Sequence, residues 1–349
     1  MVLPRNERFS QDAGGAISIV VRYLAEAGDA LVLGMPVAFP VPGLRFQPVG
    51  RRLAATAMGY RLGVVLAVRR LQPQFVDVHQ QPLLARVLAR LCPGCRVSLV
   101  LHNDPLRMRE LKTVGKRRAT LRLMFQVIAV SADLARRYMV GLCASEGAPV
   151  VQVNPINLSC QPSCLEKRQE FIFVGRVTPD KGVDLFIEAC SRVLPRLPGW
   201  SARIVGGERF GLGQVATPFV KTMREAAAAA GVECTGYMPH AQVLQALAEA
   251  AIAVMPSRMI EGFPLTAMEA LANGAALVAT RQGGLPEAAG EAAMYVPTGD
   301  VEALAEAMLA LATDAPARAR LAEAGLARVR QFDLPVVAQS WARMRQSAG

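Results

Sequence analysis

Two glutamates eight positions apart, Glu261 and Glu269, bound the segment of this chain that carries the most chemistry. Gly262 and Pro264 lie between them, and proline suits the first turn of a helix but not its interior. We therefore expect Glu261 in a loop and Glu269 one or two turns into a helix. Carboxylates pair with hydroxyl groups, and backbone N–H groups at a helix N-terminus attract anionic or hydroxyl oxygens. The segment is therefore suited to a polyhydroxylated, phosphorylated ligand.

The whole segment 261–287, EGFPLTAMEALANGAALVATRQGGLPE, resembles the E-x7-E signature of the retaining family-4 glycosyltransferases, which have the GT-B fold. The spacing alone is weak evidence, and an ordinary amphipathic helix with a turn is the alternative. The specificity comes from the EGFPLT loop, the Asn273-Gly274 break and the later GGLPE turn, which are independent signals in one register. The resemblance implies an α/β fold of two Rossmann-like, doubly wound parallel-sheet domains facing across a cleft.

The resemblance also implies an activity, the transfer of a hexose with retention from a nucleotide-diphosphate sugar. It implies that Glu269 binds the ribose hydroxyls and that Glu261 lies beside the transferred sugar. Sugar hydroxyls or phosphate would be held by the backbone N–H groups of Gly262, Phe263 and Leu265 and by the hydroxyl of Thr266. Front-face transfer is implied, in which the leaving diphosphate helps to deprotonate the acceptor, and a covalent step at Glu261 is the rival mechanism.

An earlier basic segment suits the diphosphate of such a donor. Residues 171–182, FIFVGRVTPDKG, place Arg176 and Lys181 after an apolar run and resemble the diphosphate-binding segment of the same family. Arginine offers a planar fork of donors and lysine a mobile point charge, and both would stabilise a departing diphosphate more than the ground state. The alternative is an exposed pair of cations at a turn. The chain contains no Asp-x-Asp, so we expect metal-independent transfer without a cofactor, from a UDP- or GDP-linked donor.

The chain has three histidines, and two of them are candidates for the site. His102 ends an apolar strand-like run and matches the histidine that the family places near the anomeric centre or the 6-hydroxyl of the sugar, with a structural histidine as the alternative. His79 ends the preceding run, where an acceptor contact and a structural role are equally compatible with the sequence. His240 follows a proline and is expected only to start a helix.

Glycines and one tyrosine complete the donor-binding candidates. The Gly14-Gly15 pair either lets the backbone of the first domain approach the donor phosphate through Gly15 or forms a simple turn. In the second half, two further candidates follow predicted strands, namely Gly206 and Tyr237.

The chain of 349 residues is long enough for two domains. Short apolar runs alternate with helical patterns, which is typical of parallel sheets flanked by helices, with ligands beyond the carboxyl ends of the strands. We predict an acceptor-binding domain at 1–160, a nucleotide-sugar-binding domain at 168–331 and a helix at 332–349 that crosses back to the first domain. The first strand is expected to be short, natively or through a late start codon, because only three residues precede Pro4.

The expected elements follow from this alternation. Strands are predicted at 30–33, 75–79, 97–102, 127–131, 150–153, 171–174, 202–205, 232–236, 252–255 and 276–279. Helices are predicted at 16–27, 53–71, 82–91, 132–142, 181–194, 217–230 and 241–250, besides the helix of the Glu269 segment.

Charge is distributed unevenly along the chain. Residues 1–165 hold 21 Lys and Arg against 9 Asp and Glu, whereas residues 166–349 hold 18 against 19. Nucleic acid is an unsupported partner, because no recognition motif or aromatic interleaving accompanies the basic half. An anionic membrane surface is the better candidate, at ~1 kcal/mol for each nearby basic residue, and a generally arginine-rich composition is the alternative.

This charge and the resemblance together favour a cell-envelope or lipid-linked glycan acceptor of the lipopolysaccharide, exopolysaccharide or capsule type. A cytoplasmic protein at the inner face of the cytoplasmic membrane is expected, because no apolar run reaches the ~18 residues of a membrane span and no signal peptide is evident. The competing functions are a nucleotide-sugar epimerase, a glycan phosphorylase and a non-catalytic sugar-nucleotide-binding protein. Seven scattered cysteines favour free thiols over a disulfide framework or a metal site at Cys92 and Cys95.

Overall fold

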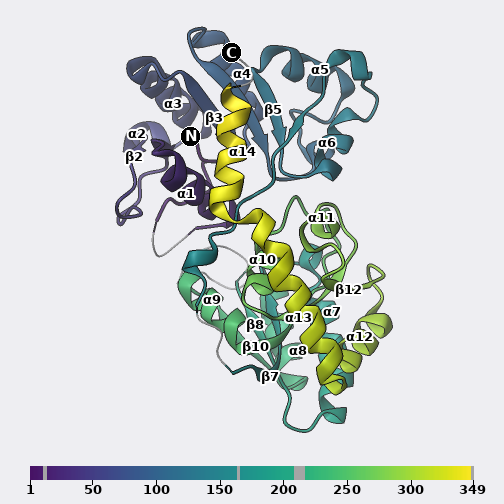
Figure 1. The fold of residues 1–349 in the computed structure, drawn as a ribbon. Coiled ribbons are helices and arrows are strands. Elements are labelled where there is room, and N and C mark those ends of the chain that lie inside the picture. The colour runs from purple at the N-terminus through teal and green to yellow at the C-terminus, as the bar shows by residue number, and fades with distance from the viewer. Residues whose placement is uncertain (11–13, 163–165, 208–216, 347–349) are drawn as a thin grey trace. The chain divides into compact units, whose positions relative to one another are not determined.

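The computed structural model describes residues 1–10, 14–162, 166–207 and 217–346 (Figure 1). The chain divides into two compact units. The first comprises Met1–Pro155 and Leu334–Gly349, and the second comprises Ile156–Asp333. Both are built from parallel strands and helices. Among the described residues, no helix combines the length and the apolar character that crossing a membrane requires.

The second unit contains a six-stranded parallel sheet in the order β12-β11-β10-β7-β8-β9. Its strands are β7 (Arg168–Val174), β8 (Ser201–Val205), β9 (Val232–Gly236), β10 (Ala250–Met255), β11 (Ala276–Thr280) and β12 (Ala293–Val296). The chain moves outward from β7 to β9, returns to β10 beside β7, and then moves outward in the other direction. The strand order therefore reverses between β7 and β10, as in a doubly wound sheet.

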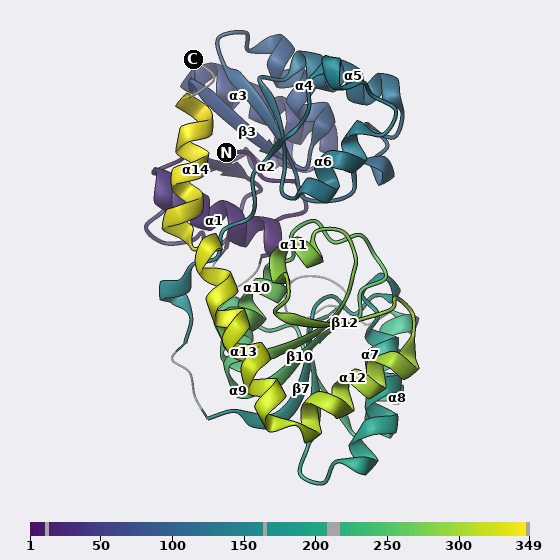
Figure 2. The same ribbon diagram turned by 45° about the vertical axis from the view of Figure 1, so that its right-hand side comes forward.

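Helices cover both faces of this sheet, which explains why β10 and β11 are buried along their whole length and apolar except for Thr280. One layer contains α7 (Val183–Val193), α8 (Pro218–Ala229) and α12 (Val301–Thr313). The other contains α9 (His240–Glu249), α10 (Leu265–Ala272), α11 (Leu285–Ala289) and α13 (Ala315–Val329), as Figure 2 shows. The sequence analysis did not predict β12, α12 or α13.

The first unit also has only parallel pairings among its described strands. A four-stranded sheet has the order β3 (Phe75–His79), β4 (Arg96–Leu101), β5 (Gln126–Ala129) and β6 (Val150–Val151), and a separate pair consists of β1 (Val32–Gly34) and β2 (Phe46–Pro48). Val2 forms bridges to Leu33 of β1 and to Val78 of β3 and so connects the two groups. The segment expected as a short first strand thus contributes a single bridged residue at the centre.

The helices of this unit are α1 (Ala16–Gly28), α2 (Arg51–Ala54), α3 (Ala57–Leu71), α4 (Pro82–Leu91), α5 (Val114–Leu123), α6 (Ala132–Met139) and α14 (Leu334–Gln346). The prediction of one helix at 53–71 is wrong, because α3 starts anew where the Thr56 side chain accepts a hydrogen bond from the N–H of Gly59. The C-terminal helix α14 packs beside α1 within this unit (Figures 1 and 2). Arg345 of α14 forms an ion pair with Asp77 of β3.

Candidate functional site

Charged side chains gather in the second unit where the strand order reverses. β7 and β10 are neighbours, but the chain leaves β7 toward β8 and leaves β10 toward β11. Arg176 and Lys181 follow β7, and Ser257 and Glu261 follow β10. Connections diverge at such a point, which is where doubly wound sheets bind their ligands. The candidate site is therefore the carboxyl ends of β7 and β10.

An ion pair joins the two connections. Nζ of Lys181 lies 2.8 Å from Oε1 and 3.0 Å from Oε2 of Glu261, and the hydroxyl of Ser257 donates a hydrogen bond to Oε1. The side chain of Glu261 is 6% exposed and that of Lys181 is 21% exposed. A carboxylate this deeply buried is costly without a partner. The sequence analysis assigned Lys181 to the diphosphate and Glu261 to the transferred sugar of a donor. The structure brings the two side chains into direct contact.

Two glycines allow the connections to approach one another closely. Gly182 has φ +73°, and a Cβ atom there would lie 2.1 Å from the carbonyl oxygen of Pro256. Gly206 has φ +140°, and a Cβ atom there would lie 1.9 Å from the carbonyl oxygen of Gly175. Both the backbone angles and the lack of space require glycine. The structure therefore explains Gly206 through backbone packing at the end of β8, next to the site.

Ion pairs hold the connection between β7 and α7. Nη2 of Arg176 lies 3.5 Å from Oδ2 of Asp180, and both side chains are more than one third exposed. Arg258, which follows β10, donates two hydrogen bonds of 2.7 Å to Asp184. Burial would raise the pKa of Asp184, but the hydrogen bond and charge of Arg258 outweigh burial and hold the pKa below its usual value. The connection is thus fixed while Arg176 remains accessible.

A second buried carboxylate is paired with a histidine. Oε1 of Glu269 lies 2.5 Å from Nε2 of His240, and the two side chains are 4% and 15% exposed. His240 does start α9, as predicted, but the sequence gave no sign of its contact with Glu269. The contact depends on the packing of α9 against α10. A histidine four residues after the carboxyl end of β9 was a signal that the sequence offered.

The first turn of α10 lies beside these carboxylates in sequence, and Pro264 precedes it as predicted. N–H groups of a first turn have no acceptor within their own helix and lie at the positive end of its dipole. The ring of Phe263 packs edge-on against Phe332, with centroids 5.1 Å apart. Tyr237 is half-buried after β9. The remaining predicted residues of this turn are buried or half-buried, namely Gly262, Leu265 and Thr266.

In the first unit, His79 and His102 follow or end neighbouring strands and contact each other. Nδ1 of His79 lies 2.9 Å from Nε2 of His102, and the rings stack with centroids 5.2 Å apart. Burial lowers the pKa of His102 to about 3 and holds the pKa of His79 well below its usual value. His102 is 7% exposed, whereas His79 has no exposed surface. The enclosed side chain of His79 therefore favours the structural role over the acceptor contact, the two alternatives that the sequence left open.

The N–H group of Gly15, a candidate for a phosphate contact or a simple turn, has a partner within the chain. The N–H of Gly15 donates a hydrogen bond of 3.0 Å to Oε2 of Glu7, a buried carboxylate that the sequence analysis did not consider. Gly15 immediately precedes α1, so Glu7 lies where the dipole of that helix favours an anion. This N–H group is occupied by the chain itself and is not offered to a phosphate in this structure.

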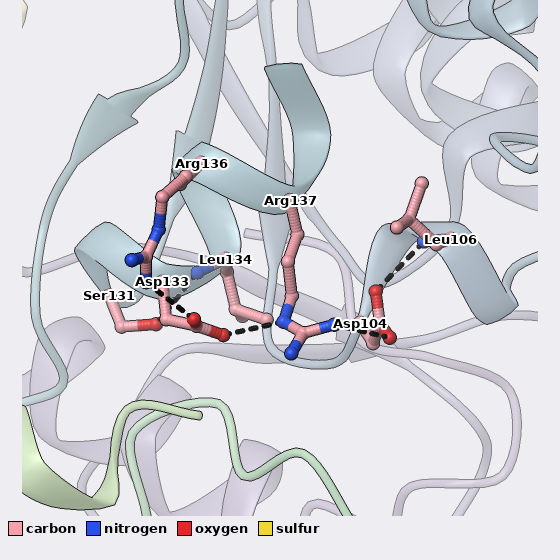
Figure 3. Close-up of polar contacts among 7 residues, drawn as sticks. All are labelled: Asp104, Leu106, Ser131, Asp133, Leu134, Arg136 and Arg137. Carbon is pink, nitrogen blue, oxygen red and sulfur yellow. Dashed lines mark hydrogen bonds and ion pairs between the residues drawn. The ribbon is translucent and has the colours of Figure 1, made fainter. Parts of the chain in front are cut away.

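A network of charged groups connects the ends of β4 and β5 in the first unit (Figure 3). Nε of Arg137 lies 2.6 Å from Oδ2 of Asp133, and Nη1 of Arg137 lies 3.5 Å from Oδ2 of Asp104. Asp133 also pairs with the exposed Arg136, at 2.6 Å. Asp104 lies two residues after His102, so Arg137 ties the connection that carries this histidine to α6. Two hydrogen bonds from backbone N–H groups complete the network, from Leu106 to Asp104 and from Leu134 to Ser131.

The cysteines and the acidic residues do not form a metal site within the described part of the chain. Cys92 and Cys95 are both free thiols there. Burial raises the pKa of both thiols, which opposes the thiolate form that redox chemistry and metal binding need.

The second unit matches a known family model. Residues 168–314 match the family described as "Glycosyl transferases group 1", a range that includes Lys181, Glu261 and Glu269. The D-inositol 3-phosphate glycosyltransferase of Corynebacterium glutamicum (strain R) is 34% identical over 168 residues, which are 46% of this chain and 39% of that protein. The lipopolysaccharide core biosynthesis mannosyltransferase LpsB of Rhizobium meliloti (strain 1021) is 32% identical over 160 residues, 44% of each chain. The chain thus spans less than half the length of these curated relatives.

Solved structures resemble nearly the whole chain. Sucrose-phosphate synthase from Thermosynechococcus elongatus has a TM-score of 0.79 at 19% identity, covering 99% of this chain and 97% of that one. HepE from Anabaena, in complex with UDP-glucose, has a TM-score of 0.76 at 18% identity, covering 97% and 98%. At such identities the likeness shows the fold alone. The predicted α/β fold with two Rossmann-like domains, the GT-B fold, is confirmed.

Proposed function

We propose that this protein is a retaining glycosyltransferase that moves a hexose from a nucleotide-diphosphate sugar to a cell-envelope glycan or lipid-linked acceptor. The observation that carries the proposal is the contact of Lys181 with Glu261 at the strand reversal, with Arg176 accessible on the same connection. The match of residues 168–314 to a glycosyltransferase family supports it. A paired cation and carboxylate can bind a diphosphate and a sugar hydroxyl side by side.

In the proposed reaction, Arg176 and Lys181 neutralise the charge that develops on the leaving diphosphate as the glycosidic bond breaks. Their stabilisation is greater in the transition state than in the ground state, because the bridging oxygen gains negative charge only as the bond lengthens. Lys181 then exchanges part of its contact with Glu261 for the diphosphate. Glu261 binds hydroxyls of the transferred sugar, and the leaving diphosphate assists removal of the proton from the acceptor. No metal is required in this scheme.

The nucleoside part of the donor is assigned to Glu269. Held by His240, its carboxylate would accept hydrogen bonds from the ribose hydroxyls, and Tyr237 directly follows β9, three residues before His240. The solved HepE structures are described as complexes with UDP and with UDP-glucose, which supports a nucleotide-sugar donor here. UDP- and GDP-linked donors are both compatible with these residues.

The acceptor is assigned to the first unit, with His102 as the residue near the reacting sugar. Two relatives are named for the biosynthesis of lipopolysaccharide core and of amylovoran, and these names favour an acceptor from cell-envelope polysaccharide. The basic charge of residues 1–165 favours an anionic membrane surface, and hence a cytoplasmic protein at the inner face of the membrane.

Two assays test this function. Thermal unfolding is followed with UDP, GDP, ADP and inorganic pyrophosphate, and one nucleoside diphosphate is expected to raise the melting temperature because it binds only the folded state. The corresponding nucleotide sugars are then incubated without acceptor in the presence of EDTA. Slow release of the anomerically retained sugar supports a retaining, metal-independent transferase, and a changed sugar still attached to the nucleotide would indicate an epimerase. Binding without any turnover would indicate a sugar-nucleotide-binding protein.

A further inference from the structure

Helix α3 of the first unit has an apolar outer face as well as an apolar inner face. Its inner side chains are buried in a core shared with β3 and β4, including Tyr60 and Val64. On the outer side, Met58 is 78% exposed, and Leu62 and Leu66 are each 51% exposed. Met58, Leu62 and Leu66 are spaced by four positions, so they lie one above another on the same side of the helix. They form a continuous apolar stripe rather than scattered surface residues.

The apolar surface continues past the end of α3. Leu71 at the end of the helix is 39% exposed, and Leu91 at the end of α4 is 45% exposed. Nε of Arg69 donates a hydrogen bond of 3.2 Å to the carbonyl oxygen of Leu91, which connects the two helix ends. Figure 1 shows α3 and α4 as neighbours in the first unit.

The charges of the two helices are of one sign. α3 carries Arg61, Arg69 and Arg70, and neither α3 nor α4 contains an acidic residue. A helix with apolar side chains and arginines on its exposed surface is typical of helices that lie in the interface of an anionic membrane. The apolar groups enter the acyl boundary, and the guanidinium groups contact lipid phosphates.

We propose that this outer face of α3, formed by Met58, Leu62 and Leu66 with Arg61, Arg69 and Arg70, docks the protein on an anionic bilayer. The inference deepens the proposed function, because it places the membrane contact on one helix rather than on the basic half as a whole. A second copy of the chain fits this face less well. In a two-fold interface the same patch meets itself, so the arginines of both copies would be brought together.

Flotation of the full-length protein with vesicles tests the proposal. Vesicles of phosphatidylcholine alone are compared with vesicles that contain one third phosphatidylglycerol, and recovery is expected mainly with the anionic vesicles. The apolar variant M58S/L62S/L66S is expected to lower partitioning about tenfold or more, because the burial of three apolar groups is lost. The charge variant R69Q/R70Q is expected to lower it about thirtyfold, at ~1 kcal/mol or about fivefold for each arginine.

The matched control is V336S, which removes a 51% exposed apolar residue from α14 of the same unit and is expected to bind as wild type does. Circular dichroism and melting temperature establish that each variant is folded. Wild-type flotation of the M58S/L62S/L66S variant would overturn the proposal. So would a wild-type dimer, detected by light scattering, that this variant converts to a monomer. Donor binding by the variants, measured by thermal shift, is expected to be unchanged. A failure of the membrane-docking proposal can therefore be distinguished from a failure of the proposed transferase function.

Discussion

His79 and His102 are joined by a hydrogen bond of 2.9 Å between Nδ1 of His79 and Nε2 of His102, in an interior where both imidazoles are neutral near pH 7. Two neutral rings share one proton in this bond, so one ring donates and the other accepts. Nε2 of His79 is buried without a partner. If Nδ1 of His79 accepted the bond, the hydrogen of this neutral ring would be on Nε2. It would then be a buried N–H donor without an acceptor, which is rarer in proteins than an unpaired acceptor. The geometry therefore favours His79 as the donor.

This assignment predicts the tautomer of His102. With its Nε2 accepting, His102 carries its proton on Nδ1 and can offer that N–H to an oxygen of a substrate. Long-range ¹H–¹⁵N spectra of protein labelled on histidine report the protonated nitrogen of each ring, and the chain gives only three sets of signals. The H240Q and H79Q variants assign them. His102 is expected as the Nδ1–H tautomer in wild type and as a tautomer mixture in H79F, where the donor is lost.

The same pair predicts a dependence of stability on pH. The pKa of His102 is about 3 in the folded protein against 6.5 in the unfolded chain, so the unfolded state binds more protons between these values. Stability is therefore retained above pH 6.5 and falls as the pH decreases toward 3, at ~1.4 kcal/mol per pH unit for one such histidine. The charged groups that act on His79 are the Met1 amine and Arg345.

Urea unfolding of wild type and of H79Q/H102Q between pH 7 and pH 4 measures this dependence. Carboxylates contribute equally to both proteins, so the difference between the two isolates the histidines. We expect the free energy of unfolding to fall more steeply with decreasing pH in wild type. Parallel curves would contradict neutral, buried imidazoles.

Lys181 and Glu261 are expected to be energetically coupled. K181M leaves a carboxylate that is 6% exposed with Ser257 as its remaining side-chain partner among the contacts described, and it should lower stability by about 2–4 kcal/mol. The double variant K181M/E261Q removes the unpaired charge as well, so it should recover at least about 1 kcal/mol. Both should lose the melting-temperature shift that the nucleoside diphosphate produces. K221M, which removes an exposed lysine on α8, is the control and should retain both properties.

Much of the second unit could be predicted from sequence because local and tertiary signals agree there. Gly182 directly precedes α7 and Gly206 directly follows β8, both at positions where only glycine fits, so these glycines mark element boundaries in the sequence as well as in the backbone. The first unit has weaker signals. Helix α5 was missed because its few apolar residues do not form a stripe, and its buried Arg117 instead donates hydrogen bonds to the carbonyl oxygens of Tyr138 and Leu111.

The candidate site was predictable to the extent that its residues follow strands. Arg176 and Glu261 were predicted in this way, and Lys181 was predicted from the basic segment that follows the same strand as Arg176. The contacts of Glu269 with His240 and of Glu7 with Gly15 were not predicted, because they depend on which helices and loops pack together. A spacing in sequence identifies a carboxylate, but it does not show what occupies that carboxylate in the folded chain.

The pairing of Glu269 with His240 leads to a prediction about the ribose. If Glu269 accepts hydrogen bonds from both ribose hydroxyls, E269A should weaken binding of the preferred nucleoside diphosphate by about tenfold to a hundredfold, since bonds to a charged acceptor contribute ~1.5–3 kcal/mol. It should leave binding of inorganic pyrophosphate unchanged. Isothermal titration with the 2′,3′-dideoxy nucleotide provides the control, because that ligand lacks both ribose hydroxyls and should bind wild type and E269A almost equally. A large loss of pyrophosphate binding would instead assign Glu269 a structural role.

The contact between Glu7 and Gly15 sets two effects against each other. The dipole at the N-terminus of α1 favours an ionised Glu7, by about 0.3–1 kcal/mol, whereas burial disfavours the charge. The pKa of Glu7 is raised, with burial as the largest cause against the hydrogen bonds from Gly15 and Ser18, so burial prevails. A raised carboxyl pKa means that the folded state holds a proton more tightly than the unfolded chain, and that ionisation of Glu7 costs stability as the pH rises through the folded pKa.

E7Q keeps an acceptor oxygen without the charge, so at pH 7 it should be at least as stable as wild type in urea unfolding. E7A leaves the N–H of Gly15 without this acceptor and should lose about 1–2 kcal/mol. Equal losses in E7Q and E7A would show that the charge of Glu7, and not only its oxygen, stabilises the start of α1.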